Sequence, residues 1–217
     1  MKKFVDKHIH KGLRAKLVAD LRRKGIKNQA ILSAFLAIPR HYFLDEAFFQ
    51  WAYKDAAFPI EVGQTISQPY TVAMQTLLLE VNHNDKILEI GTGSGFQACI
   101  LSYLGAKVYS IERQKVLFEK TYKLLRQIGF SKIRTLYGDG FKGAAKFAPF
   151  DKIIITCGAT EIPHSLFSQL IDGGIMVVPA GNGDNKKMYK ITKQGEKLIK
   201  EEHGIYRFVP MLQGVNV

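Results

Sequence analysis

The stretch over residues 86–95 carries the pattern best suited to chemistry, Lys-Ile-Leu-Glu-Ile-Gly-Thr-Gly-Ser-Gly. A short apolar strand there holds one acid, Glu89, and stops at Gly91, Gly93 and Gly95. Glycine has no Cβ, so it lets the backbone turn sharply and come close to a ligand. Because ligands of open α/β sheets bind at the carboxyl ends of the strands, this turn is a candidate binding site.

The spacing of the glycines separates two kinds of cofactor. A dinucleotide fingerprint, G-x-G-x-x-G, would need glycine at position 96, where this chain has Phe96. The observed pattern, E-x-G-x-G-x-G, resembles the first motif of S-adenosylmethionine (AdoMet) methyltransferases. A dinucleotide brings a pyrophosphate to the helix N-terminus, whereas AdoMet carries a sulfonium cation that suits a nearby carboxylate such as Glu89. A plain tight turn is the alternative, and the adjacent acid makes it the weaker one.

Two further acids end the strands that follow. Glu112 lies about 20 residues after the first glycine, where a carboxylate can hold both ribose hydroxyls of an adenosine. The same logic serves NAD and AdoMet, so it supports adenosine without choosing the cofactor. Asp139 ends the next strand between glycines, where it could accept a hydrogen bond from the adenine amino group or form an ordinary Asp-Gly turn. Acids at consecutive strand ends predict one pocket at one edge of the sheet.

A polar loop over residues 58–70 precedes the glycine-rich strand by one helix. It contains two prolines, a glycine, hydroxyls and amides, which is typical of an irregular segment that carries function. Ser67 is its candidate functional hydroxyl. Alternatively, Ser67 or Thr71 caps the following helix, since both are good N-cap types.

The remaining chain alternates strands and helices, which predicts an α/β, doubly wound, Rossmann-like fold with a mainly parallel central sheet and helices on both faces. An N-terminal helical extension over residues 1–57, with an aromatic-rich short helix in residues 40–53, should precede a domain over residues 58–217. Expected helices cover residues 7–23, 29–37, 71–81, 96–104, 114–128 and 163–170. Besides the strand from Lys86, expected strands cover residues 107–111, 133–137, 151–156, 175–179, 187–193 and 205–209.

Composition narrows the classes of function. The chain has 217 residues, a net charge of +12, 47% hydrophobic residues and two cysteines without a zinc-ligand spacing. No signal peptide or membrane span is apparent, so we expect a cytoplasmic protein that binds neither metal nor membrane. Much of the positive charge lies in residues 2–27, which favours a solvated helix face over a nucleic-acid footprint. We read Cys157 as a packed residue rather than a nucleophile.

Several motifs together give a specific resemblance. They are Gly-Gln-Thr-Ile-Ser-Gln-Pro-Tyr at 63–70, Leu-Glu-Ile-Gly-Thr-Gly-Ser-Gly-Phe-Gln-Ala at 88–98, Tyr-Ser-Ile-Glu-Arg at 109–113, Gly-Asp-Gly at 138–140, Ala-Pro-Phe-Asp at 148–151 and Phe-Val-Pro at 208–210. In this order, over roughly residues 30–210, they resemble the protein-L-isoaspartate O-methyltransferases. The segment Cys-Gly-Ala-Thr at 157–160 departs from the small residues and proline usual in that family.

The resemblance implies methyl transfer from AdoMet to the α-carboxylate of L-isoaspartyl residues in damaged proteins and peptides, which starts their repair. It places the active-site serine at Ser67 and a substrate-holding backbone at Val209. The implied cofactor residues are Thr65, Ile66, Glu89, Gly91, Thr92, Gly93, Ser94, Gly95, Glu112, Arg113, Asp139 and Gly140. Because an α-carboxyl has a reference pKa of about 3.3–3.7, it is already a nucleophile at neutral pH and needs no general base.

Two alternatives remain open from the sequence. The basic charge could belong to an RNA methyltransferase, although we do not expect nucleic acid as a partner. The chain could also be a binding module that keeps the AdoMet fold without the transfer reaction. The presence of Ser67, Glu89 and Glu112 argues against the second alternative.

Overall fold

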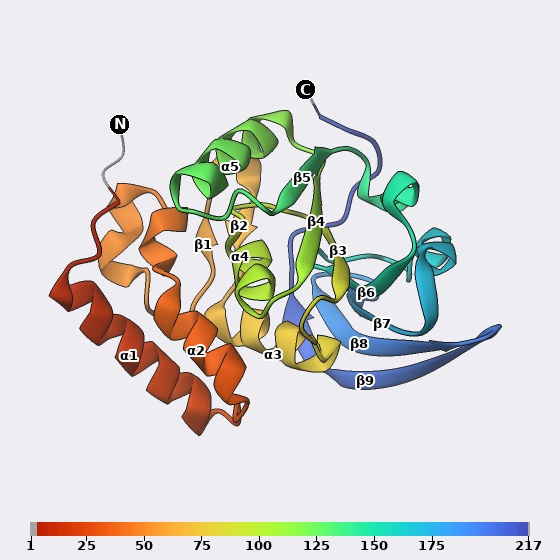
Figure 1. Ribbon diagram of the computed structural model, residues 1–217, viewed down its shortest axis with the longest axis horizontal. Coiled ribbons are helices and arrows are strands. Elements are labelled where there is room, and N and C mark those ends of the chain that lie inside the picture. Colours follow the sequence, from red (N-terminus) through yellow and green to blue (C-terminus); the bar gives the residue numbers. More distant parts are fainter. Residues whose placement is uncertain (1–3, 217) are drawn as a thin grey trace.

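The computed structural model describes residues 4–216, and its centre is a seven-stranded sheet with the order β5-β4-β3-β6-β7-β8-β9 (Figure 1). The first five strands in this order are parallel, and β8 and β9 are antiparallel. The strands are β3 (Lys86–Ile90), β4 (Lys107–Glu112), β5 (Arg134–Tyr137), β6 (Phe150–Ile155), β7 (Leu170–Ala180), β8 (Asn185–Gln194) and β9 (Lys197–Arg207). This topology confirms the predicted doubly wound, Rossmann-like fold.

The two faces of the sheet are covered differently. Residues of one face, including Ile87, share a buried core with all five α-helices. The helices are α1 (His8–Arg23), α2 (Gln29–Ala37), α3 (Pro69–Leu79), α4 (Phe96–Tyr103) and α5 (Lys115–Gln127). The other face, including Leu88, packs against Phe147 of the 3-10 helix η5 (Ala145–Phe147) and against Leu166 and Phe167 of the 3-10 helix η6 (His164–Gln169). The 3-10 helix η4 (Gly140–Lys142) lies beside Ile90 of the same face. Alternating strand residues are therefore apolar on both sides, as in a parallel sheet covered on two faces.

Four sequence predictions need correction. The helix expected at 163–170 is the 3-10 helix η6, and the aromatic segment forms two 3-10 helices, η1 (Arg40–Phe43) and η2 (Glu46–Trp51). The loop at 58–70 contains a small antiparallel pair, β1 (Phe58–Pro59) and β2 (Thr65–Ile66), around the 3-10 helix η3 (Glu61–Gly63). The last strand, expected at residues 205–209, instead begins at Lys197 and ends at Arg207. The sequence pattern did not reveal the full length of β9, because it is an exposed edge strand whose charged residues are little buried.

The N-terminal extension packs through apolar residues of α1 and α2, with Leu17, Val18 and Leu21 buried. Asn28 caps α2 as predicted, since its side chain accepts from the Ile31 N–H at 3.1 Å. Acids of this same chain pair with basic groups of the extension, in the pairs Arg14–Asp6, Arg23–Asp20 and Lys24–Asp55. Arg14 is buried, but the exposed pairs of Arg23 and Lys24 favour the solvated-face interpretation of the basic stretch. Its first lysine, Lys2, lies outside the described residues.

Across residues 4–216, no helix combines the length and the apolar character that crossing a membrane would require. The division of the chain between residues 57 and 58 stays a prediction.

One ionisable side chain lies in the core of the sheet. Glu89 on β3 is 0% exposed and faces Ser110 of β4, its partner in the parallel register. The Ser110 hydroxyl donates to one Glu89 oxygen and lies 2.6 Å from the Thr92 hydroxyl oxygen. Burial raises the pKa of Glu89 to about 8, because an ionised carboxylate is poorly solvated there.

This burial predicts a pH-dependent stability. With a folded pKa near 8 and an ordinary value of 4.5, Glu89 favours unfolding increasingly as pH rises from 4.5 to 8, because the unfolded state releases the proton first. Glu89→Gln removes that titration. We expect the melting temperature of the variant to rise relative to wild type by several degrees between pH 5 and pH 8. A difference between the two proteins that stays constant with pH would contradict the buried, protonated acid.

Candidate active site

The main pocket lies at the carboxyl ends of β3, β4 and β6. The chain runs outward from β3 to β5 and returns to β6 on the other side of β3, so the strand order reverses there. Ligands of doubly wound sheets bind at such a switch point. The pocket is lined by Gln64, Thr65, Ile66, Ser67, Val72, Ile90, Gly91, Thr92, Gly93, Ser94, Phe96, Gln97, Ile111, Glu112, Arg113, Gly140, Thr156, Cys157, Val209, Pro210, Met211 and Leu212.

The glycine turn forms the floor of this pocket between β3 and α4. Gly91, Gly93 and Gly95 all have positive φ, at 95°, 51° and 85°. A Cβ on Gly91 would lie 2.7 Å from the Thr156 hydroxyl oxygen, and one on Gly95 would lie 2.8 Å from a Thr121 methyl carbon. A Cβ on Gly93 would meet nothing closer than 3.8 Å. Internal packing therefore requires glycine at 91 and 95, whereas Gly93 leaves room in the pocket for a ligand to approach the backbone.

Glu112 connects this turn to the end of β4. Its carboxylate accepts from the Gly93 N–H at 2.8 Å through one oxygen and from the Gln114 N–H at 2.8 Å through the other. The side chain is 5% exposed and lines the pocket. Each carboxylate oxygen keeps a second acceptor position, so the group can still receive two hydroxyls of a ligand. The geometry fits the predicted ribose contact.

Three predicted cofactor residues lie outside the lining. Glu89 is buried beneath the floor, and Gly95 faces α5. The Asp139 carboxylate accepts from the Phe141 N–H at 2.9 Å and from the Gly214 N–H at 2.9 Å, so it caps a turn and ties down the C-terminal segment. Their contact with a cofactor stays a prediction. The other predicted residues line the pocket together: Thr65, Ile66, Ser67, Gly91, Thr92, Gly93, Ser94, Glu112, Arg113, Gly140 and Val209.

Ser67 lies between β2 and α3, at the junction of the pocket with an adjoining groove. The N-cap of α3 is Gln68, without a side-chain cap of its own, and the Tyr70 N–H donates to the Asp55 carboxylate at 2.8 Å instead. Neither Ser67 nor Thr71 therefore provides the helix cap. The Ser67 hydroxyl is therefore available to a ligand in the pocket that it lines.

The C-terminal segment contributes Val209 to Leu212 to the lining of the pocket. The Gly158 N–H donates to the Val209 carbonyl at 2.8 Å, and the Met211 N–H donates to the Gly158 carbonyl at 2.9 Å. Sequence reasoning missed Met211 and Leu212 in the lining, although the Phe-Val-Pro motif just before them marked the segment. Cys157 also lines the pocket and packs against the core, and burial raises the pKa of its thiol to about 12, which favours the protonated form.

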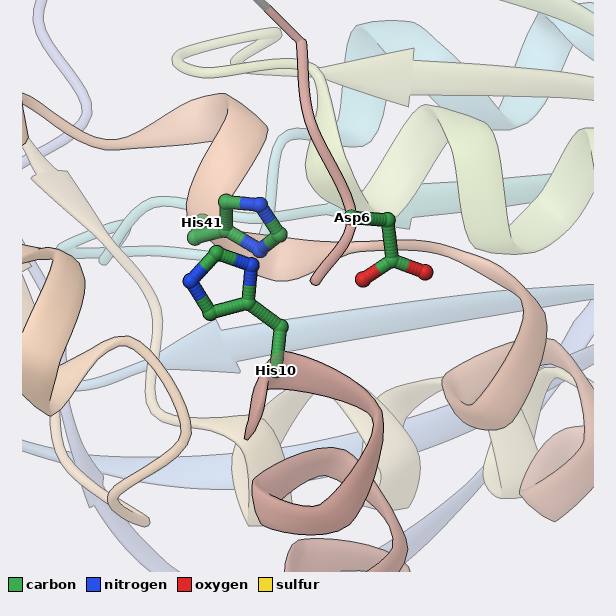
Figure 2. Close-up of side chains that lie close together, drawn as sticks. All are labelled: Asp6, His10 and His41. Atoms are coloured by element: carbon green, nitrogen blue, oxygen red, sulfur yellow. The ribbon is translucent and has the colours of Figure 1, made fainter. Parts of the chain in front are cut away.

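A second cluster of ionisable groups lies in the N-terminal extension (Figure 2). The His10 and His41 rings lie with their centroids 3.9 Å apart at an interplanar angle of 44°, and both Asp6 oxygens accept from the Arg14 guanidinium. The His41 nitrogens lie 2.7 Å from the Tyr53 hydroxyl and 3.2 Å from the Val5 carbonyl. Burial lowers the pKa of His41 to about 4, so the ring is neutral. These contacts explain the cluster as packing of the first described residues onto the extension.

Comparison with known proteins shows which family this chain resembles. The family model described as protein-L-isoaspartate (D-aspartate) O-methyltransferase matches residues 13–216. A protein-L-isoaspartate O-methyltransferase from Flavobacterium psychrophilum is 52% identical over 207 residues, which cover 95% of this chain and 97% of the relative. One from Dictyoglomus thermophilum is 47% identical over 198 residues, 91% of this chain and 90% of the relative.

Two solved structures of proteins with this name also superpose on the chain. A structure titled protein-L-isoaspartate O-methyltransferase superposes with a TM-score of 0.83 at 28% identity, covering 91% of this chain and 65% of its own. A Plasmodium falciparum structure, described as a putative enzyme of the same name in complex with S-adenosyl-L-homocysteine, has a TM-score of 0.79 at 22% identity. It covers 94% of this chain and 98% of its own, and supports the fold. With a match over almost the whole chain and relatives near half identity, this chain belongs to the protein-L-isoaspartate (D-aspartate) O-methyltransferase family.

Proposed function

We propose that this chain is a protein-L-isoaspartate O-methyltransferase. It transfers a methyl group from AdoMet to the α-carboxylate of L-isoaspartyl residues in damaged proteins and peptides, and the resulting ester starts their repair. The observation that carries the proposal is the junction at Ser67, where an adenosine-compatible pocket opens into a peptide-sized groove. Family membership and the names of the relatives support the same reaction. We place the enzyme in the cytoplasm.

The pocket offers a specific fit for AdoMet, which supplies the methyl group. Glu112 would hold the ribose through its two remaining acceptor positions. The open space at Gly93 lets the cofactor approach the backbone, and Thr92 and Ser94 lie beside it in the lining. Glu89 lies outside the lining and is protonated near neutral pH, so its contribution to the cofactor would pass through Ser110 and Thr92.

The groove offers a place for the damaged peptide. It runs between the start of α3 and the end of β9, and it shares Thr65, Ser67, Thr156 and Val209 with the cofactor pocket. A peptide in the groove would therefore present its carboxylate beside the methyl donor. We assign Ser67 the role of orienting this carboxylate by donating a hydrogen bond. Alignment and exclusion of water then supply the catalysis, since the nucleophile is already ionised.

The alternatives have less support. An RNA methyltransferase rests on net charge alone, and neither the family match nor the curated relatives favour it. A binding module without chemistry would not need Ser67 at the shared junction of two cavities.

The direct test uses radiolabelled AdoMet with an isoaspartyl peptide and its aspartyl twin. We expect base-labile label in the isoaspartyl peptide and background label in the twin, because only the isoaspartyl linkage leaves an α-carboxylate free within the chain. Bulk RNA under the same conditions serves as a control. Equal label in both peptides, or label in the RNA, would overturn the assignment.

Substitutions of Glu112 test its proposed contact with the ribose of AdoMet. Glu112→Ala and Glu112→Gln should both weaken AdoMet binding about ten- to a hundredfold, from the loss of about 1.5–3 kcal/mol of hydrogen bonding to a charged group. The amide variant is not spared, because each carboxylate oxygen accepts a backbone N–H and an NH₂ group would face a donor. Calorimetric titration measures both affinities. Wild-type affinity in both variants would move the ribose away from Glu112.

Ser67→Ala tests the chemical step. Removing one orienting donor should slow single-turnover methyl transfer by about ten- to a thousandfold, by analogy with the loss of one donor from a preorganised site. AdoMet affinity should change far less. The wild-type rate should stay nearly flat from neutral pH up to the pH at which the fold is destabilised, because no general base titrates. Full activity of Ser67→Ala would remove its orienting role, and a clear rise in rate through a neutral pKa would reveal a base.

A further inference from the structure

The α3 helix begins immediately after Ser67 and takes its N-terminal cap from a distant residue. The Tyr70 N–H, in the first turn of α3, donates to the Asp55 carboxylate at 2.8 Å. Asp55 lies 15 residues before Tyr70 in the chain. A carboxylate at this position satisfies a free backbone donor and interacts favourably with the helix dipole. Asp55 thus fixes where α3 starts.

Asp55 also holds the residue next to Ser67. The Gln68 side-chain amide donates to the Asp55 backbone carbonyl at 3.2 Å. The second carboxylate oxygen of Asp55 pairs with the Lys24 ammonium group at 2.6 Å, at the end of α1. The Asp55 side chain is 13% exposed and that of Lys24 is 48% exposed. Asp55 therefore contacts two residues on the helix side of Ser67, and one partner in the extension.

The same segment of chain holds the other side of Ser67. Phe58 pairs with Ile66 and Pro59 with Thr65 in the β1–β2 ladder. Upstream, the guanidinium of Arg40, which is 1% exposed, donates to the backbone carbonyls of residues 52 and 56 at 3.0 Å and 3.3 Å. A buried cation thus supports the segment that positions Ser67 from both sides.

We propose that Asp55 is a positioning residue for methyl transfer, whose carboxylate acts through Tyr70 on the Ser67 hydroxyl. Asp55 lines neither the pocket nor the groove, so it does not touch cofactor or substrate directly. Orientation of a reacting group is sensitive to displacements well below an ångström, so loss of this anchor should slow the reaction more than it weakens AdoMet binding. The proposal rests on the function proposed above.

The test compares Asp55→Ala with Asp55→Asn, using kcat and KM for an isoaspartyl peptide and the calorimetric Kd for AdoMet. The amide oxygen of asparagine can still accept the Tyr70 N–H, whereas alanine offers no acceptor. We expect kcat to fall about ten- to a hundredfold in Asp55→Ala, with the AdoMet Kd changed less than about threefold. Asp55→Asn should keep kcat within about threefold of wild type, and so should Lys24→Met, which removes only the ion pair.

A matched control separates positioning from general stability. The Asp172 carboxylate accepts the Gly195 N–H at 2.6 Å, between the start of β7 and the turn that joins β8 to β9, and it lines neither cavity. Asp172→Ala removes a comparable bond and should leave kcat unchanged. If Asp55→Ala does not fold, Asp55→Glu keeps the charge but displaces the acceptor by one methylene, and it should lower kcat about tenfold without changing the AdoMet Kd.

The possible results distinguish failure of the positioning role from failure of the proposed function. An active wild type beside equally active Asp55→Ala or Asp55→Glu would overturn the positioning role alone. A parallel loss of kcat and AdoMet affinity in Asp55→Ala, or an equal loss of kcat in Asp55→Asn, would also overturn it. A wild type that methylates neither the isoaspartyl peptide nor its twin would overturn the proposed function, and this proposal with it.

Discussion

The hydrogen bond from the Gly93 N–H to the Glu112 carboxylate is the interaction on which the site depends. It joins the turn after β3 to the end of β4 across 2.8 Å and sets the carboxylate toward the pocket. The parallel register brings the two strand ends side by side, with Ile90 opposite Ile111. The glycine turn can follow this path only because Gly91 and Gly95 have no Cβ to collide with Thr156 and α5. Sheet geometry and backbone conformation therefore create the cofactor site together.

The catalytic side of the site is built by longer-range contacts. Ser67 projects from a short connection whose two ends are held by one upstream segment, through β1 and through Asp55. The N-terminal extension supports that segment through the buried Arg40. If Ser67 orients the substrate as proposed, the extension helps to position that serine, although none of its described residues lines the cofactor pocket. The family match, which begins at residue 13, includes most of it.

Local spacing made the glycine turn, Glu112 and the alternating α/β fold predictable, because turns and strand ends are encoded in adjacent residues. Ser67 and Val209 came from the family resemblance. The sequence did not predict the cap from Asp55, because its partner is 15 residues away and only the fold brings them together. It also misplaced β9, whose charged residues face solvent. The sequence did not predict the complete burial of Glu89, because only the structure shows that α-helices cover the face of β3 that Glu89 shares with Ile87.

The most direct measurement is a crystal structure of the protein with S-adenosyl-L-homocysteine and an isoaspartyl peptide. We expect both ribose hydroxyls on Glu112, the peptide in the groove beside the end of β9, and the Ser67 hydroxyl oxygen about 3 Å from the α-carboxylate. The carboxylate should point at the sulfur. A ribose away from Glu112, or a carboxylate bound out of reach of Ser67, would contradict the proposed roles of these two residues.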